Sequence, residues 1–398
     1  MLLLVGAGCQ SVPDGYEPLP PSGVPANEPI RSVEKSGRPS ETGLIPVPQP
    51  PVVSLPAVPV PEQQVPPPVN PGTEELATSP GLLEFPVEAP SVMPAQVPET
   101  APAAAGPGDW VDLESALRER GWSGLTPAPR GKELRHESTG PGGMLAVVVG
   151  QKKMWWNGTQ VWLGFEPRFD RGRVRVNRLD LESHLQPLVS GGAMPSVTAR
   201  TVVIDAGHGG RNPGSRSIAG NRFEKELTLD WALRLQRVLE ARGWKVWMTR
   251  TNDVDLTLAE RVDLAESAGA SIFISLHFNS TFPSRDPAGL ETYTVTPRGM
   301  ASHVVRDYPD DPRKSYPANA HDAASLRLAV AVQRSVLAET GQVDRGVRRA
   351  RFMDVLRWQN RPSILVEGGY LSNPQEAARI QTPEFRQKLA EAVAAGLP

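Results

Sequence analysis

Hydrophobic and polar residues follow three successive patterns along this 398-residue chain. Between residues 10 and 107, Pro recurs every few positions among Val, Ala, Glu and Gln. From Trp110 onward, short apolar runs are separated by Gly and Asn-Gly. From Arg200 onward, apolar runs of strand length alternate with segments in which apolar residues recur at helical spacing. We therefore divide the chain into a Pro-rich segment, a middle module and a carboxy-terminal domain.

The carboxy-terminal pattern predicts an α/β fold. We expect strands at 201–205, 245–249, 271–276, 290–296 and 363–367, and helices at 224–242, 258–267, 326–339 and 384–395. Alternation of this kind predicts a mostly parallel sheet flanked by helices on both faces. We place this domain at residues 199–398.

The middle segment, residues 109–190, predicts a small β-rich module. Strands are expected at 144–149, 152–156, 160–163 and 173–177, with short helices at 110–121 and 179–185 and an end to the second helix at Pro187. Asn157-Gly158 between two apolar runs is a strong hairpin signal. Trp at strand positions is either core or a surface on which sugars stack, and both interpretations apply here to Trp155, Trp156 and Trp162.

The amino-terminal quarter has the composition of a tether. Of the 42 Pro residues, 25 lie between Pro13 and Pro107, whereas all nine Trp lie at Trp110 or later. Pro fixes its own backbone angle and biases the preceding residue toward extended conformations. Residues 10–107 are therefore predicted to be a disordered, semi-rigid spacer that rises about 3 Å per residue where it is extended.

Charge and cysteine content restrict the function. The net charge of −2 combines −8 in residues 1–107 with +6 in the remainder. Charges this small exclude a nucleic-acid-binding surface that depends on overall positive charge. The single Cys, Cys9, excludes a disulfide framework and a multi-Cys metal site. Residues 1–9 resemble the end of a bacterial lipoprotein signal, with the start placed too far downstream. This resemblance implies lipid at Cys9 and membrane attachment; the alternative is an incidental Cys in an apolar tip.

Candidate ligands follow the predicted strands. His208 follows the first strand, His277 follows the third, Glu367 ends the fifth, and Glu224 begins the first long helix. In open α/β sheets, substrates and cofactors bind at the carboxyl ends of the strands. We therefore expect these side chains to converge there. Two imidazoles and a carboxylate, with a fourth position left for water, form a ligand set of catalytic zinc sites.

Other polar residues carry weaker expectations. Glu226 is the rival of Glu224. Asp205 is expected to orient His208 or to cap a turn, and Arg261 to meet either a substrate carboxylate or a surface partner. Residues 297–322, with four Pro, are expected to form either a substrate-facing loop or a plain surface loop.

Four blocks resemble the zinc-dependent N-acetylmuramoyl-L-alanine amidases of bacterial cell walls: VVIDAGHGGRNPG, EKELTLDWALRL, SIFISLHFNS and SILVEGGYLSN. The resemblance implies one Zn²⁺ bound by His208, Glu224 and His277, with Glu367 as the catalytic glutamate. Thr228 and Phe278 depart from the usual family residues, and Phe278 is expected to narrow the cleft.

The implied activity is hydrolysis of the amide bond between N-acetylmuramic acid and L-Ala of peptidoglycan, in cell-wall remodelling or cell separation. Two alternatives stay open: a zinc peptidase that acts on wall peptides, and an inactive wall-binding scaffold. The implied location is the bacterial envelope, periplasmic or extracytoplasmic, and a monomer is the default oligomeric state.

Overall fold

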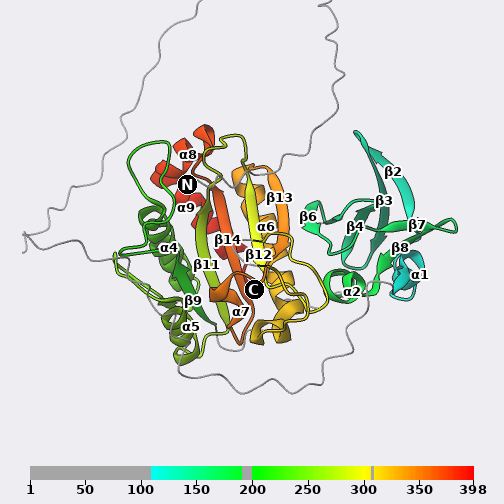
Figure 1. Cartoon of the computed structure of the whole chain (residues 1–398), viewed down its shortest axis with the longest axis horizontal. Coiled ribbons are helices and arrows are strands. Elements are labelled where there is room, and N and C mark those ends of the chain that lie inside the picture. Colours follow the sequence, from blue (N-terminus) through cyan, green and yellow to red (C-terminus); the bar gives the residue numbers. More distant parts are fainter. Residues whose placement is uncertain (1–108, 191–199, 306–308) are drawn as a thin grey trace, which may run out of the picture. The chain divides into compact units, whose positions relative to one another are not determined.

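The computed structural model describes residues 109–190, 200–305 and 309–398 (Figure 1). Cys9 and the predicted tether at 10–107 lie outside these residues. Within the described part of the chain, no helix combines the length and the apolar character needed to cross a membrane.

The carboxy-terminal domain alternates strands and helices as predicted. Its strands are β9 (Thr201–Ala206), β10 (Lys245–Met248), β11 (Ile272–Asn279), β12 (Leu290–Thr294), β13 (Asp344–Arg349) and β14 (Ser363–Tyr370). Its helices are α4 (Glu224–Ala241), α5 (Leu258–Ser267), the 3₁₀ helix η2 (Pro317–His321), α6 (Asp322–Thr340), α7 (Asp354–Arg357), α8 (Pro374–Gln381) and α9 (Pro383–Ala395).

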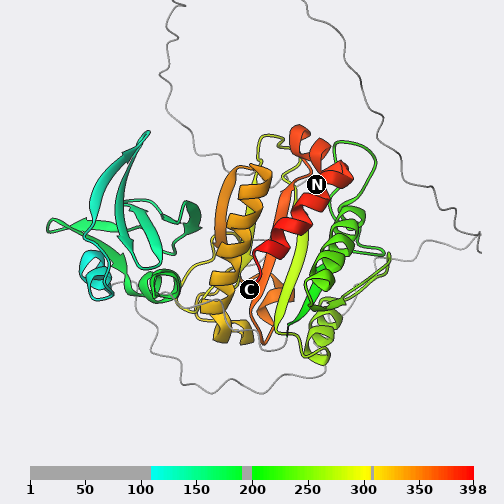
Figure 2. The ribbon, with the colours of Figure 1, turned by 180° about the vertical axis from the view of Figure 1, so that it is seen from behind.

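These strands form one sheet in the order β10-β9-β11-β14-β12-β13. Neighbouring strands are parallel except β12 and β14, which are antiparallel. Helices α4, α6 and α9 cover one face, as seen from behind in Figure 2, and α5 and α7 lie on the other. The predicted fold class is therefore confirmed.

Helix α4 shows why this arrangement forms. Its apolar residues Leu227, Trp231, Leu235 and Leu239 recur at helical spacing, and each has no exposed surface. They join the core beneath the sheet together with residues of α6 and α9. Burial of each such side chain stabilises the folded domain by about 1.5–3 kcal/mol. This packing fixes Glu224, the first residue of α4, relative to the strand ends.

The β-rich module contains eight strands: β1 (Trp110–Asp112), β2 (Thr126–Arg130), β3 (Glu133–Gly140), β4 (Gly143–Val148), β5 (Lys153–Trp156), β6 (Thr159–Trp162), β7 (Arg168–Asp170) and β8 (Arg173–Asn177). The Asn157-Gly158 hairpin is confirmed, with positive φ at both residues, 48° and 84°. Helix α1 (Leu113–Arg118) is shorter than the predicted 110–121, because Trp110–Asp112 form β1 and Asp112 caps the helix.

The second helical run of the module does not stop at Pro187. It passes from α2 (Arg178–Asp180) through a π-helical turn (Leu181–Leu185) into α3 (Gln186–Val189). Pro187 lies in the first turn of α3, directly after the π-helical turn, in which the Gln186 amide donates to the Leu181 carbonyl. The run therefore continues past a residue that itself supplies no amide.

The tryptophans of the module are structural. Trp155 and Trp156 are each only 7% exposed, and the indole N–H of Trp162 donates to the carbonyl of Arg345 at 2.7 Å. The buried rings of Trp155 and Trp156 are therefore core, whereas Trp162 is half-buried and fixed through its indole N–H.

Strand β6 continues the sheet of the carboxy-terminal domain beside β13. Val161 pairs with Val347, and the amide of Gln160 donates to the Asp344 carboxylate at 2.7 Å. The buried guanidinium of Arg349 donates to the Ser183 carbonyl at 2.9 Å. Side-chain hydrogen bonds as well as backbone pairing therefore join the β-rich module to the carboxy-terminal domain.

His303 belongs to this junction and predicts a pH dependence of stability. Its Nε2 donates to the Leu163 carbonyl and its Nδ1 accepts from the Arg349 amide, a pattern that only the neutral imidazole supports. Burial, with the nearby His184 and Arg349, lowers the pKa of His303 from 6.5 to about 3. Between these two values the unfolded chain binds a proton that the folded chain does not, so stability falls as pH falls.

We expect His303→Gln to flatten this dependence. Urea unfolding at several pH values from about 7 down to about 4 measures it, because only the wild type then loses the His303 contribution. Parallel stability profiles for the two proteins would contradict the assignment.

Candidate metal centre

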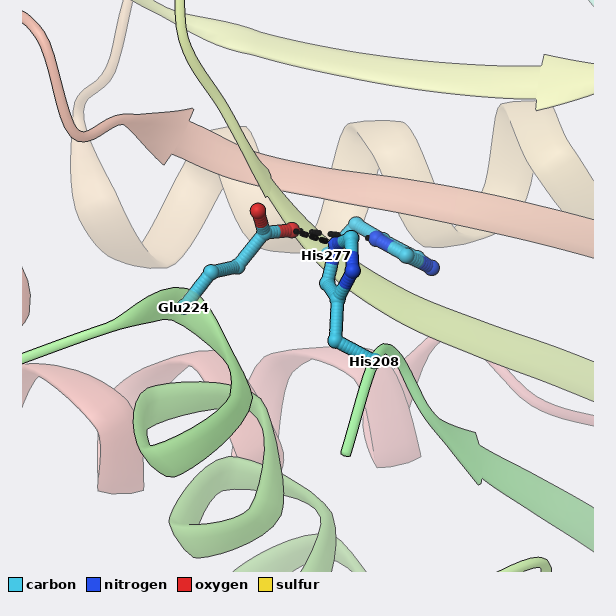
Figure 3. Close-up of side chains that lie close together, drawn as sticks. All are labelled: His208, Glu224 and His277. Atoms are coloured by element: carbon cyan, nitrogen blue, oxygen red, sulfur yellow. Dashed lines mark hydrogen bonds and ion pairs between the residues drawn. The ribbon is translucent and has the colours of Figure 1, made fainter. Parts of the chain in front are cut away.

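Three side chains from separate elements meet at the carboxyl edge of the sheet (Figure 3). His208, Glu224 and His277 each offer one ligand atom, and these atoms lie within 4.8 Å of one another. The two imidazole rings meet edge to face with centroids 4.8 Å apart. The convergence expected from the sequence is therefore present.

His208 lies in the turn that follows β9, in the left-handed region at φ 62°. Its Nε2 lies 3.0 Å from the Oε1 of Glu224, and its Nδ1 lies 3.0 Å from the Oδ1 of Asn212. Left-handed geometry is strained for a residue with a side chain and persists only where the surroundings fix it. Asn212, which was not predicted from the sequence, therefore orients the His208 ring through Nδ1, the ring nitrogen that does not contact Glu224.

Two buried arginines fix the turn before His208. Arg261 donates to the carbonyls of Ala206 and His208 at 2.9 and 2.8 Å, and to Asp205 at 2.6 Å. Arg250 donates to the carbonyls of Ala206 and Gly207 at 2.9 and 2.8 Å. Burial lowers the pKa of Arg250 to about 10, so it stays charged at neutral pH.

Both expectations for Arg261 are wrong, because its guanidinium is buried against the β9 turn. Asp205 also does not touch the His208 ring: its carboxylate accepts from Arg261, Thr249 and Ser275. The link from Asp205 to His208 runs through Arg261 and the backbone. Arg250 follows the carboxyl end of β10, at the same edge of the sheet. This position after a strand is the sequence signal that could have identified Arg250 as part of the site.

Glu224 is the first residue of α4 and is 3% exposed. Its Oε1 lies 3.0 Å from both His208 and His277 and accepts from the Phe278 amide at 3.1 Å. Its Oε2 accepts from the Ser215 amide at 3.0 Å. Burial raises the pKa of Glu224, but the hydrogen bonds from His208 and His277 outweigh it and hold the pKa well below its usual range. The helix N-terminus further favours the anion.

Glu367 lies beside His277, because the two residues pair across the parallel strands β14 and β11. Both strands extend past the predicted ends at 276 and 367, so both side chains project from strand positions. Glu367 is 7% exposed and lines, together with the three clustered residues, a hollow of about 460 Å³. The sheet thus presents a carboxylate directly next to the cluster.

A second buried carboxylate, Glu291, pairs with Glu367 across β12 and β14. Its Oε1 accepts from Arg345 at 2.5 Å and from the Tyr370 hydroxyl at 3.0 Å, while its Oε2 accepts from the Tyr293 hydroxyl at 2.5 Å. Burial raises the pKa of Glu291, but Arg348 and these partners lower it overall. Glu291 is therefore a charged structural group. Sequence reasoning missed it because, apart from Tyr293 on the same strand, its partners Arg345, Arg348 and Tyr370 lie on β13 and β14.

The remaining sequence candidates lie elsewhere. Glu226 is exposed and pairs with Arg222 at 3.4 Å, so the cluster contains Glu224 and not its rival. Phe278 is among the residues that line the hollow, and its ring is buried and packs against Trp231. Thr228 donates to the Gly207 carbonyl at 2.8 Å. The other histidines of the described residues take no part in the cluster.

The segment 297–322 does not face this hollow. Of its described residues, Gly299, Ala301 and Pro312 line a different hollow beside the β-rich module, and none lines the one at the cluster. Ser302 and Arg351 hold Asp310, which fixes part of the segment against the domain. The described residues of this segment therefore favour the plain surface loop, since none of them lines the hollow at the cluster.

The donor set fits a divalent metal ion. Two imidazoles and one carboxylate are typical of catalytic zinc, and the carboxylate is already ionised. Glycines make room for the cluster: a Cβ at Gly207 would lie 2.4 Å from the His277 ring, and one at Gly214 would lie 2.6 Å from the His208 ring. The cluster is therefore suited to hold a metal ion.

Comparisons with known proteins agree with this geometry. A sequence model of the N-acetylmuramoyl-L-alanine amidase family matches residues 202–398. The N-acetylmuramoyl-L-alanine amidase LytC of Bacillus subtilis (strain 168) is 34% identical over 197 residues, which cover 50% of this chain and 34% of that protein. The chain thus spans about a third of the length of this relative.

Two further relatives each match about half of this chain. The uncharacterized protein YqiI of Bacillus subtilis (strain 168) is 31% identical over 205 residues, 52% of this chain and 86% of that protein. The crystal structure of an N-acetylmuramoyl-L-alanine amidase from Clostridium difficile 630 is 31% identical, with a TM-score of 0.42, and the match covers 50% of this chain and 94% of that one. The chain belongs to the N-acetylmuramoyl-L-alanine amidase family.

Gly207→Ala tests how tightly the cluster is packed. The added methyl would collide with the His277 ring and displace it, so metal affinity should fall at least about tenfold. Competition with a chromogenic chelator measures the affinity. Gly243→Ala is the matched control: its Cβ meets nothing within 4 Å, and its φ of 79° costs stability without touching the cluster. Equal metal affinity in the Gly207→Ala and wild-type proteins would refute the packing argument.

Proposed function

We propose that this protein is a zinc-dependent amidase that hydrolyses the bond between the lactyl carbonyl of N-acetylmuramic acid and the amino group of L-Ala in peptidoglycan. One observation supports this most strongly. In a chain of the amidase family, His208, Glu224 and His277 form a three-ligand cluster, and Glu367 lines the same hollow.

His208, Glu224 and His277 would hold the zinc ion. When bound, zinc would act as a Lewis acid and lower the pKa of a water ligand toward about 7, which would provide a nucleophile at neutral pH. Glu224 supplies a negative charge from a buried position, and Asn212 and the Arg261-clamped turn keep the His208 imidazole aimed at the cluster.

Glu367 would act as the general base and then as the general acid. Its carboxylate takes a proton from the attacking water as the water oxygen bonds to the lactyl carbonyl carbon. It then gives that proton to the nitrogen of L-Ala as the C–N bond breaks, because an amine leaves poorly unless it is protonated. The products are a glycan with a free lactyl carboxylate and an intact stem peptide.

The proposed site of action is the bacterial envelope, outside the cytoplasm. Curated relatives are named as N-acetylmuramoyl-L-alanine amidases, and their substrate is a wall polymer. Lipid at Cys9 and a spacer formed by residues 10–107 would let the hydrolase reach the wall from a membrane surface.

Glu367→Gln should reduce peptidoglycan hydrolysis by about 10²–10⁴-fold while metal content is unchanged, since general acid–base catalysis contributes this much. Digestion of purified peptidoglycan in excess zinc, with products identified by mass, measures it. Glu226→Gln, a substitution of an exposed glutamate on the same helix, should retain wild-type activity.

Product masses also separate the alternatives. The amidase releases intact stem peptides that begin with L-Ala, whereas a peptidase shortens the peptides. A zinc-loaded wild type that leaves all amide bonds uncut would refute the enzyme, and full activity in Glu367→Gln would refute only the mechanism.

The lipid anchor is testable separately. A bacterial host that expresses the chain behind a complete lipoprotein signal should incorporate labelled palmitate into the wild type and not into Cys9→Ser. Incorporation that does not depend on Cys9 would contradict the anchor.

A further inference from the structure

A second hollow of about 750 Å³ adjoins the one at the metal cluster. Its walls come from two loops, residues 215–221 after β9 and residues 280–285 after β11. Ser215 and Ser280 line both hollows, so the two form a continuous depression. A substrate cut at the cluster and longer than the scissile group would extend into this second hollow.

Both loops are fixed relative to the catalytic candidates. The Ile218 amide donates to the Leu371 carbonyl at 3.1 Å, and the Asn373 side chain donates to the Arg285 carbonyl at 3.0 Å. Leu371 and Asn373 directly follow β14, the strand that carries Glu367. The Glu224 amide in turn donates to the Ser215 carbonyl at 2.8 Å. The walls of the second hollow are therefore built onto the same elements as the cluster.

The second hollow is positively charged. It is lined by two exposed arginines, Arg216 and Arg285, and by no carboxylate. Within the described residues, neither guanidinium has an ion pair with a carboxylate, and Arg216 donates only to the amide oxygen of Asn221 at 2.9 Å. Nearby arginines differ: Arg211 and Arg222 each pair with an acidic side chain. Two uncompensated guanidinium groups at one depression favour an anionic ligand.

The first hollow has a different character where it is not shared. Apart from the residues of the cluster, Glu367 and the Asp354 carboxylate, the side chains that line it there are mostly apolar and include Leu258, Phe352, Met353 and Val355. Apolar walls suit the N-acetyl group and the carbon face of a sugar ring better than a charged peptide. The two hollows thus offer different chemistry to the two halves of a glycopeptide.

We infer that Arg216 and Arg285 form a subsite for a free carboxylate of the stem peptide, so that the peptide leaves the metal cluster across Ser215 and Ser280 while the sugar lies toward Phe352. This inference rests on the proposed amidase function. The carboxylate nearest the cleaved bond is the α-carboxylate of the D-Glu that follows L-Ala, and it is the group that the two guanidiniums would bind.

Two glycopeptides that differ in one charge test the subsite: N-acetylmuramoyl-L-Ala-γ-D-Glu-L-Lys amide, with the D-Glu α-carboxyl either free or amidated. For the zinc-loaded wild type, KM should be about tenfold lower for the free acid, with similar kcat, because the contact is formed equally in ground and transition states. The Arg216→Gln/Arg285→Gln double variant should lose this preference. Arg237→Gln, which removes one exposed arginine on α4 away from both hollows, should keep it.

Isothermal titration calorimetry distinguishes the subsite hypothesis from the amidase hypothesis. It uses the peptide product alone, L-Ala-γ-D-Glu-L-Lys amide, with the D-Glu α-carboxyl either free or amidated. Charge-dependent binding that is lost in the double variant, without hydrolysis by the wild type, would retain the subsite and refute the amidase. Hydrolysis with equal KM for the two glycopeptides, or an equal loss for both in the double variant, would refute the subsite and leave the amidase standing.

Discussion

The buried carboxylate of Glu224 is the group on which the site depends. One oxygen receives His208 from the β9 turn, His277 from β11 and the Phe278 backbone amide, while the other accepts from Ser215. An ionised carboxylate at 3% exposure is costly unless such partners compensate it. The partners in turn require the β9 turn to hold its strained shape, which is why Arg250 and Arg261 are buried there. Removing the charge would loosen three elements at once.

Much of this fold could be predicted from the sequence, because its signals are local. Apolar spacing identified α4 within one residue of its end, and Asn157-Gly158 identified its hairpin. The failures have a common cause in distant partners. β2 contains two Pro and is mostly exposed, and β13 is rich in charge, so neither reads as a strand. The sequence does not reveal that Arg261 is buried, because a cation on an amphipathic helix usually faces water. The buried Asp205 that pairs with it lies on another element.

The site was more predictable than its supports. His208, Glu224, His277 and Glu367 stand at or near strand and helix ends, where topology brings side chains together. Asn212, Arg250 and Glu291 act through contacts that only the folded chain defines: Asn212 contacts the His208 ring, Arg250 holds the turn after β9, and Glu291 joins side chains of β12, β13 and β14. A similar distinction holds for the module: its Trp residues at strand positions favour core over sugar binding, and the burial of Trp155 and Trp156 agrees with core for these two residues.

The pairing of β6 with β13 has a consequence for the solubility of the carboxy-terminal domain. An open sheet ends in strands whose backbone groups can pair with another chain, and such edges promote aggregation. At one end the sheet stops at β10, a four-residue strand that begins with Lys245. At the other, β6 occupies the edge that β13 would otherwise expose. The β-rich module therefore serves as an edge cover, and an isolated domain of residues 200–398 would carry an unprotected strand.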